Sequence, residues 1–236
     1  MYHSRKLSFA CVFPLVFILF ITPVFAIGNT TMMIVDYDDI GSPRLAMDEL
    51  LERASELNEV INIYTSAQYP HYLCIYTLTA RAHDVVRVEV LDERVELVNI
   101  LLAPLNYGIT EMYRIHTINR LRVLEVFKGE SEAGDIIEIK QYGGKLGYIN
   151  VVNPDMAPIV VGDDIVVFIG NPGIYFGIYN LPSSLLSPFQ AAYRFTPLVE
   201  NARMRNVNVE LESVFEGNNL TLTLEDLAQI SEKNQN

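Results

Sequence analysis

Hydrophobic and polar residues alternate through much of the middle of the chain, a pattern typical of β-strands. In the segment 84–90, three valines share one face and two charged residues share the other. The unbroken apolar run 165–169 predicts a strand that is buried on both faces. Strands are expected at 84–90, 113–127, 136–141, 164–169, 174–179 and 191–195, and the alternation at 207–212 indicates either one more strand or the start of a separate tail.

Two irregularities in this pattern predict bends. The segment 113–127 is long for a strand, and its apolar positions change parity between Val123 and Leu124. One extra residue in one strand of a pair produces such a change, so a β-bulge or a sharp bend is expected there. The pair Gly143-Gly144 interrupts the pattern again and predicts a hairpin or a barrel corner.

Two segments carry a helical pattern instead. Ser42 and Pro43 supply an N-cap and a first-turn proline, and apolar residues then recur every three or four positions as far as Ile61. The polar face of this amphipathic helix is acidic, which favours packing on a core over binding to a membrane surface. Thr223 begins a short helix that extends through Ile230.

The first 26 residues predict a secretory signal peptide. Two basic residues precede an apolar run at 7–26, and small residues at its end allow cleavage before Ile27. An uncleaved membrane anchor is the alternative, because the run approaches the roughly 20 residues that span a bilayer. Cys11 lies near the start of the run, which disfavours a lipoprotein anchor. The mature chain is therefore expected to be secreted or held at the cell envelope.

Charge and cysteine content restrict the partners and the fold of the mature chain. The signal carries two of the 17 basic residues and none of the 29 acidic ones, so about −14 of net charge remains. That charge repels nucleic acid and anionic membranes, and it suits cationic ligands, metal ions or a basic partner better. Cys74 is the one cysteine left, so no internal disulfide forms, and its apolar setting at 72–76 predicts a buried structural thiol.

One stretch resembles a known family. The sequence Val-Leu-Glu-Val-Phe-Lys-Gly at 123–129 resembles the strand end of netrin-type modules, the domain class of tissue metalloproteinase inhibitors, which are OB-fold barrels. The order of the flanking segments also resembles a class of uncharacterised secreted bacterial proteins, over roughly 83–178. The chain lacks the disulfides and the N-terminal metal-coordinating cysteine of those inhibitors, so protease inhibition is carried over to no residue. The resemblance implies a barrel, and a fold does not fix a function.

The expected architecture is therefore mainly β: a small OB-like β-barrel with an N-terminal amphipathic helix and a short C-terminal helix. The chain is expected to divide into a signal peptide at 1–26, a linker and helix at 27–70, a β-barrel at 71–200, and a strand and helix tail at 201–236.

Local motifs indicate no catalytic chemistry. His71, His83 and His116 show no zinc-binding spacing, and the segment 36–41 fits a calcium loop at only part of its ligand positions. No nucleotide-binding or serine-hydrolase motif occurs. We therefore expect no cofactor, no metal and no catalytic residue that a motif identifies.

Tyrosines supply the one candidate binding surface. The chain has 13 tyrosines and no tryptophan, and Tyr142, Tyr148, Tyr175 and Tyr179 form one group among them. On a shared barrel face they would form an aromatic surface of the kind that OB-folds use for ligands. The alternative is that tyrosine simply suits β-strands.

Two functional hypotheses follow. The first is an exported binding module that holds a protein, peptide or glycan on the barrel face near Tyr142 and Tyr148. The second is a secreted hydrolase without a local motif, in which one of His71, His83 or His116 meets an acidic residue and a nucleophile.

Overall fold

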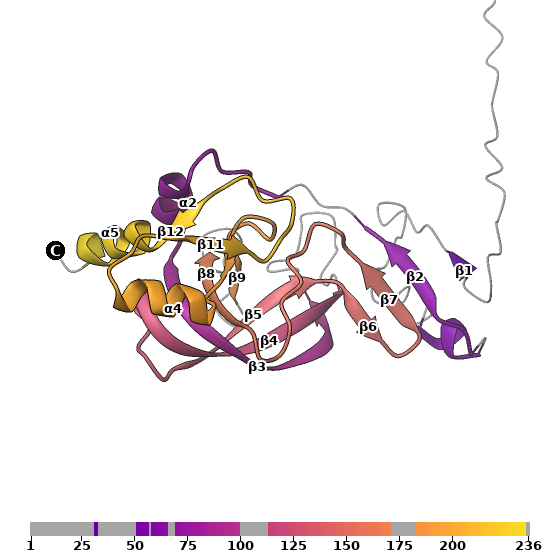
Figure 1. Ribbon diagram of the computed structural model, residues 1–236. Coiled ribbons are helices and arrows are strands. Elements are labelled where there is room, and N and C mark those ends of the chain that lie inside the picture. Colours follow the sequence, from indigo (N-terminus) through magenta and orange to yellow (C-terminus); the bar gives the residue numbers. More distant parts are fainter. Residues whose placement is uncertain are drawn as a thin grey trace, which may run out of the picture.

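The computed structural model describes residues 31–32, 51–56, 58–65, 69–99, 113–170 and 183–234 (Figure 1). Within this part the fold is mainly β. The larger sheet has the strand order β12-β11-β10-β8-β3-β4-β5-β9, and the smaller has the order β1-β2-β7-β6. The elements are β1 (Thr31–Met32), β2 (Ile61–Tyr64), α2 (Ile75–Arg81), β3 (Asp84–Asn99), β4 (Tyr113–Lys128), β5 (Ile136–Tyr142), β6 (Gly144–Leu146), β7 (Ile149–Val152), β8 (Asp164–Gly170), β9 (Ser183–Leu185), β10 (Ala192–Arg194), α4 (Pro197–Met204), β11 (Glu210–Ser213), β12 (Leu222–Thr223) and α5 (Leu224–Asn234).

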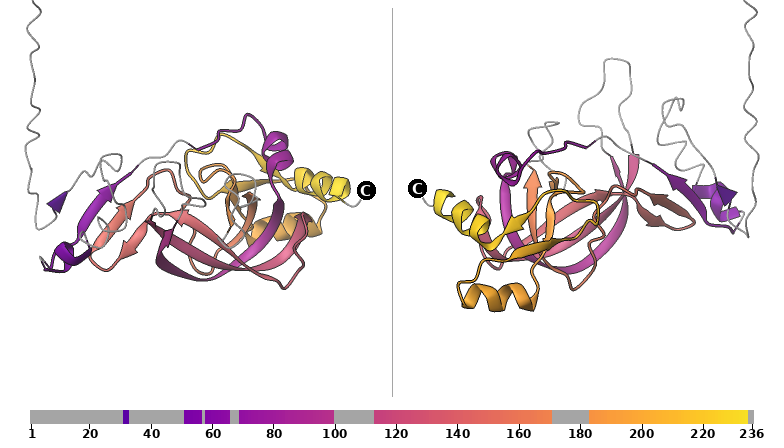
Figure 2. Two further views of the ribbon diagram at one scale, coloured as in Figure 1. Left: turned by 180° about the vertical axis from the view of Figure 1, so that it is seen from behind. Right: turned by 45° about the horizontal axis from the view of Figure 1, so that its top comes forward.

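Five strands of the larger sheet close into a barrel. Strands β3, β4 and β5 pair antiparallel in sequence order, and β5 then pairs parallel with β9. Strand β9 pairs antiparallel with β8, which returns to β3 and completes the circle. This closure confirms the expected OB-like barrel. The small sheet lies beyond one end of the barrel, and helices α4 and α5 lie toward the other (Figures 1 and 2).

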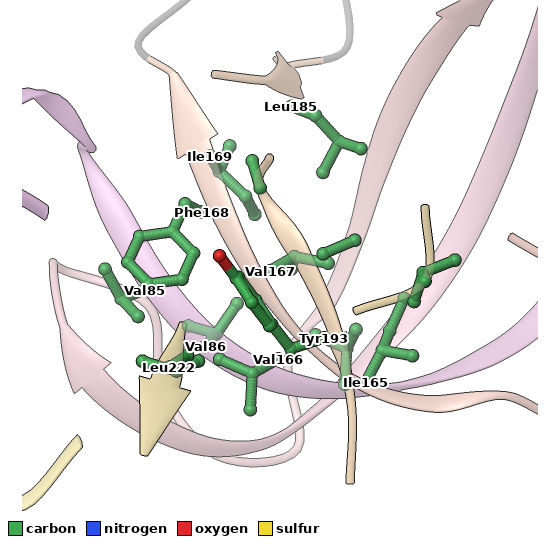
Figure 3. Packing of buried hydrophobic residues seen from close by; sticks show 14 of the residues in the cluster. Val85, Val86, Ile165, Val166, Val167, Phe168, Ile169, Leu185, Tyr193 and Leu222 are labelled. Atoms are coloured by element: carbon green, nitrogen blue, oxygen red, sulfur yellow. The ribbon is translucent and has the colours of Figure 1, made fainter. Parts of the chain in front are cut away.

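Strand β8 forms the centre of the barrel core, as its unbroken apolar run predicts. Every side chain from Ile165 to Ile169 is at most 3% exposed, so both faces of the strand are covered. Its two edges are paired as well, one with β3 and the other with β10 and β9. The Phe168 ring packs edge-on against the Tyr193 ring, with centroids 6.1 Å apart, and Val85 and Leu222 lie around them (Figure 3).

The expected bulge in β4 is confirmed at Leu124. Val88 pairs with Val123 and Arg87 pairs with Glu125, so Leu124 has no residue opposite it. The extra residue turns outward and is 38% exposed, while Val123 remains in the core. A bulge of this kind increases the local bend, which helps a five-stranded sheet to close.

The prediction of a buried thiol at Cys74 is wrong. Cys74 is exposed and occupies the N-cap position of α2, where the Thr77 hydroxyl donates a hydrogen bond to the Cys74 carbonyl at 2.8 Å. Helix α2 therefore begins within the apolar run 72–76, at Ile75. Helical spacing turns Ile75 and Leu78 toward the core, and Cys74 consequently faces solvent.

The expected N-terminal helix is helical at 51–56 and ends earlier than Ile61. Asn58 adopts a left-handed backbone conformation with φ of 51°, which ends the helix, and Ile61 begins β2 instead. Positions 42–50 lie outside the described residues, as do residues 1–30 with the expected signal peptide. Ala54, Ile61 and Ile63 form a second hydrophobic core with residues of β4 and β7.

The segment after residue 200 continues the larger sheet. Strand β11 pairs antiparallel with β10, β12 pairs with β11, and α5 follows at the position where a short helix is expected. The core-facing side chains Leu211, Leu222 and Leu227 belong to the same hydrophobic core as the barrel. Sequence patterns missed α4, although Thr196 caps it and Pro197 opens it in the same way as Ser42 and Pro43 in the first predicted helix.

Gly143 and Gly144 form the predicted corner. Both have positive φ, 120° and 126°, and here the chain leaves β5 of the barrel and enters β6 of the small sheet. A Cβ on Gly143 would lie 2.9 Å from the Val151 carbonyl oxygen, and one on Gly144 would lie 2.6 Å from the Thr117 hydroxyl oxygen. The corner therefore brings the small sheet directly against the barrel end.

Candidate functional site

The four candidate tyrosines do not form one described surface. Tyr142 ends β5 on the barrel, whereas Tyr148 lies in the turn between β6 and β7 and donates a hydrogen bond to the Asn58 side-chain oxygen at 2.7 Å. Tyr148 therefore belongs to the small sheet rather than to a barrel face. Tyr175 and Tyr179 lie outside the described residues.

Tyr142 packs on the outer face of the barrel end. Its ring lies 5.5 Å from the His116 ring, and the Arg114 guanidinium carbon lies 5.1 Å from its centroid. His116 is only 6% exposed, and burial lowers the pKa of its imidazole to about 4, with repulsion from Lys140 and Arg114 acting in the same direction. This group is therefore neutral at pH 7.

The inward face of the barrel changes from apolar to polar at the same end. Val90 pairs with Leu121 in the main core, and the next inward pair is Glu93 with Asn119. Beyond it, Val95 pairs with Thr117, and Leu97 and Ile115 belong to the second core. Glu93, Thr117, Asn119 and the neighbouring Gln141 thus form a polar layer between two hydrophobic cores, and we call this set the polar layer.

A chain of hydrogen bonds fixes the buried amides of the polar layer. The Asn119 amide nitrogen donates to the Gln141 side-chain oxygen at 2.9 Å, and the Gln141 nitrogen donates to the Ala157 carbonyl at 2.9 Å. Because a carbonyl can only accept, Gln141 must point its nitrogen at Ala157, and this sets the orientation of both amides. The Asn119 oxygen is then left without a hydrogen-bond partner, although Asn119 is fully buried.

A cavity of about 210 Å³ opens over the polar layer, and we call it the mouth cavity. Strands β3, β4 and β5, the glycine corner, β7 and the loop after it contribute to its wall. The residues that line it are Glu93, Thr117, Gln141, Tyr142, Gly143, Gly144, Val151, Asn153, Met156, Ala157, Pro158 and Ile159.

Glu93 differs from the other strand carboxylates around it. It is exposed on the cavity wall and forms no ion pair among the described residues. The other glutamates of β3, β4 and β5, and Asp92, each contact an arginine: Glu89 with Arg122, Asp92 with Arg120, Glu96 and Glu138 with Arg94, and Glu125 with Arg203.

A second, larger cavity of about 570 Å³ lies between β4, α4 and α5. Its lining includes the buried side chains of Phe127, Phe195 and Leu227. At its rim Arg203 forms two hydrogen bonds of 2.6 Å with the carboxylate of Glu125, so both charges are neutralised within the protein. This second cavity offers apolar contact, and the ion pair at its rim is complete within the protein.

The described histidines do not form a catalytic arrangement. His83 Nδ1 lies 2.5 Å from Asp84 Oδ2, and Ser131 donates its hydroxyl to the other Asp84 oxygen at 3.3 Å. The carboxylate therefore stands between the imidazole and the hydroxyl, whereas an activated serine needs the imidazole next to it. His71 stacks on Phe189 with centroids 5.7 Å apart, and His116 contacts no carboxylate.

Comparisons with known proteins leave the family open. The chain matches no protein-family model, and no curated protein is significantly similar to it. Among the described residues, no three histidine, cysteine, aspartate or glutamate side chains are placed to hold a metal ion together. No helix in that part of the chain has the length and apolar character needed to cross a membrane.

Proposed function

We propose that this protein is an exported, acidic β-barrel binding module and that the mouth cavity is its ligand site. The polar layer carries the proposal. A barrel interior can be filled with apolar side chains, and burying an amide oxygen without a partner costs free energy that folding does not require. Locally unfavourable groups of this kind are typical of functional sites.

Export is supported by the signal-like segment at 1–26, and the acidity of the mature chain agrees with partners outside the cytoplasm that carry positive charge. A protein, a peptide or a glycan remains the proposed class of partner, with a small group of that partner entering the cavity. The hydrolase alternative receives no specific support from the described residues, because no histidine among them contacts both an acid and a nucleophile.

Filling the mouth cavity should abolish binding without unfolding the protein. Met156 lines the cavity and is half-buried, so Met156→Trp is expected to occupy the cavity with a larger side chain. A library of cationic, neutral and anionic small molecules would be screened by the ¹⁵N-¹H NMR signal of the Gln141 side-chain amide. Compounds that shift this signal in the unmodified protein are expected to bind at least about tenfold more weakly to the variant.

Tyr148→Ala is the matched control, because Tyr148 lies in a turn of the small sheet and does not line the cavity. It should retain all the compounds that the unmodified protein binds. A library without any hit at Gln141, or hits that Met156→Trp binds equally well, would show that the mouth cavity is not the ligand site.

A further inference from the structure

We infer that the group held in the mouth cavity is an organic ammonium, the charged end of a polyamine or of a lysine side chain. This inference rests on the proposed function, since it names the ligand class for the same cavity. It depends on which hydrogen-bonding groups in the cavity are already used and which remain available.

Three of the polar side chains that line the cavity already donate a hydrogen bond within the protein. The Thr117 hydroxyl donates to the Gly143 carbonyl at 2.9 Å, and the Gln141 amide nitrogen donates to the Ala157 carbonyl. The Asn153 amide nitrogen donates to the Tyr69 hydroxyl at 3.0 Å. An anionic ligand such as a phosphate needs several donors at once, and this cavity holds no cationic side chain to supply them.

A charged acceptor, in contrast, remains available on the cavity wall. The Glu93 carboxylate lies on the cavity wall without an ion-pair partner among the described residues. Asn119, its direct cross-strand neighbour on the same face, keeps an unpartnered amide oxygen beneath Gln141. Residues paired in this way have Cβ atoms about 5 Å apart, so the buried Asn119 oxygen lies close behind the part of the cavity wall that carries the Glu93 carboxylate. A group with several N–H donors and a positive charge complements the Glu93 carboxylate.

Nearby cations do not neutralise Glu93. Arg114 and Lys140 lie on the same barrel end, but along their strands they alternate with Thr117 and Gln141 and therefore project from the opposite face of the sheet. The Arg114 guanidinium instead lies over the Tyr142 ring. Among the described residues that line the cavity, Glu93 is the one charged side chain.

Size and coordination favour an alkylammonium over a metal ion. A volume of about 210 Å³ is below the range of roughly 300 Å³ and above that holds drug-sized ligands, and it accommodates the end of an aliphatic chain. Calcium takes six to eight oxygen ligands, several of them carboxylates, whereas Glu93 is the one carboxylate in the lining.

Isothermal titration of the full chain with three five-carbon compounds tests this inference. Cadaverine carries ammonium groups, pentanol is neutral and pentanoate is anionic. Cadaverine alone should bind, and added salt should weaken it because screening reduces the attraction to Glu93. Glu93→Gln keeps the side-chain shape and removes the charge, and we expect it to weaken cadaverine about tenfold. Glu96→Gln is the matched control, because Glu96 lies on the same strand and is paired with Arg94.

The two sources of the ammonium are separated by a second titration with an acetylated, amidated Gly-Lys-Gly peptide. Tighter binding of the peptide than of cadaverine assigns the site to lysine side chains, and the reverse order assigns it to free polyamines. Equal binding of pentanol, or an unchanged affinity in Glu93→Gln, overturns the ammonium inference while leaving the cavity as a site. Failure of the proposed function would give a different result. In that case the charged and the neutral compounds would all bind Met156→Trp with the same affinity as the unmodified protein.

Discussion

Replacing Gly129 by alanine is expected to lower the free energy of unfolding by about 3 kcal/mol. Gly129 follows β4 with φ of 114°, a backbone conformation that residues with a side chain rarely adopt. An added Cβ would lie 1.9 Å from the Asp84 carboxylate oxygen, so the carboxylate must move as well. Asp84 is only 8% exposed and accepts hydrogen bonds from the Glu130 amide and the Ser131 hydroxyl, which would be broken.

Gly134→Ala provides the matched control for this experiment. Gly134 also has a positive φ, 98°, but an added Cβ would meet nothing within 4 Å. It should therefore lose about 1 kcal/mol, the cost of the backbone conformation without the collision. Urea unfolding of both variants measures the difference. Equal losses in the two variants would show that the contact with Asp84 does not decide the stability of this turn.

The same turn shows what the Lys128-Gly129 pair at the end of β4 does in the fold. The Lys128 ammonium donates to the carbonyls of Thr79 and Ala82, at 2.8 and 2.7 Å, and so satisfies the C-terminal end of α2. Burial lowers the pKa of Lys128, and the nearby Asp84 charge opposes that change. The pair therefore fixes a helix and a turn to the barrel, which is a structural role and gives no indication of a ligand.

Much of the barrel could be predicted because the sequence pattern of a single strand is enough to indicate how that strand is buried. The apolar run 165–169 and the parity change at Leu124 each reflect a single strand and its burial, and both match the structure. The prediction of a buried thiol at Cys74 is wrong because the apolar run 72–76 fits a strand as well as one face of a helix. Only the packing of Ile75 and Leu78 against the core distinguishes the helix from the strand.

The candidate site was not predicted because it depends on a bulge in β3, beyond the segment 84–90 in which a strand is expected. Continuing the alternation of Val86, Val88 and Val90 would place Asp92 on the inward face. The register shift between Val90 and Asp92 leaves Leu91 unpaired and turns Glu93 inward instead. The apolar residues Val95 and Leu97 were the available signal, since they require this change of parity to reach the second core.

The stability of the protein should fall as the pH falls from about 7 toward 4, and His116 should account for up to about 3 kcal/mol of this loss. Burial lowers the pKa of His116 to about 4, compared with about 6.5 in the unfolded chain. Between these two values the unfolded chain binds a proton that the folded protein does not, so acid favours unfolding. The loss begins as the pH falls below about 7 and is nearly complete at about pH 4.

The geometry around His116 shows why protonation is unfavourable. Its Nδ1 lies 3.2 Å from the Arg114 carbonyl, which can only accept, so the neutral ring carries its proton there. A second proton would have to be placed on Nε2 of a ring that is 6% exposed, with Arg114 and Lys140 both repelling the new charge. Of the described carboxylates, none forms an ion pair with this ring.

Unfolding free energies of the unmodified protein and His116→Gln, compared at pH 7.5 and pH 5.0, isolate this effect. Both proteins share the titration of their carboxylates, so the unmodified protein should lose about 2 kcal/mol more than the variant between the two pH values. His71→Gln is the control, because His71 is exposed in the folded protein and its removal should leave the unmodified pH dependence intact. An equal loss in His116→Gln would mean that His116 is protonated at little cost, and that the barrel end opens to water more readily than its packing indicates.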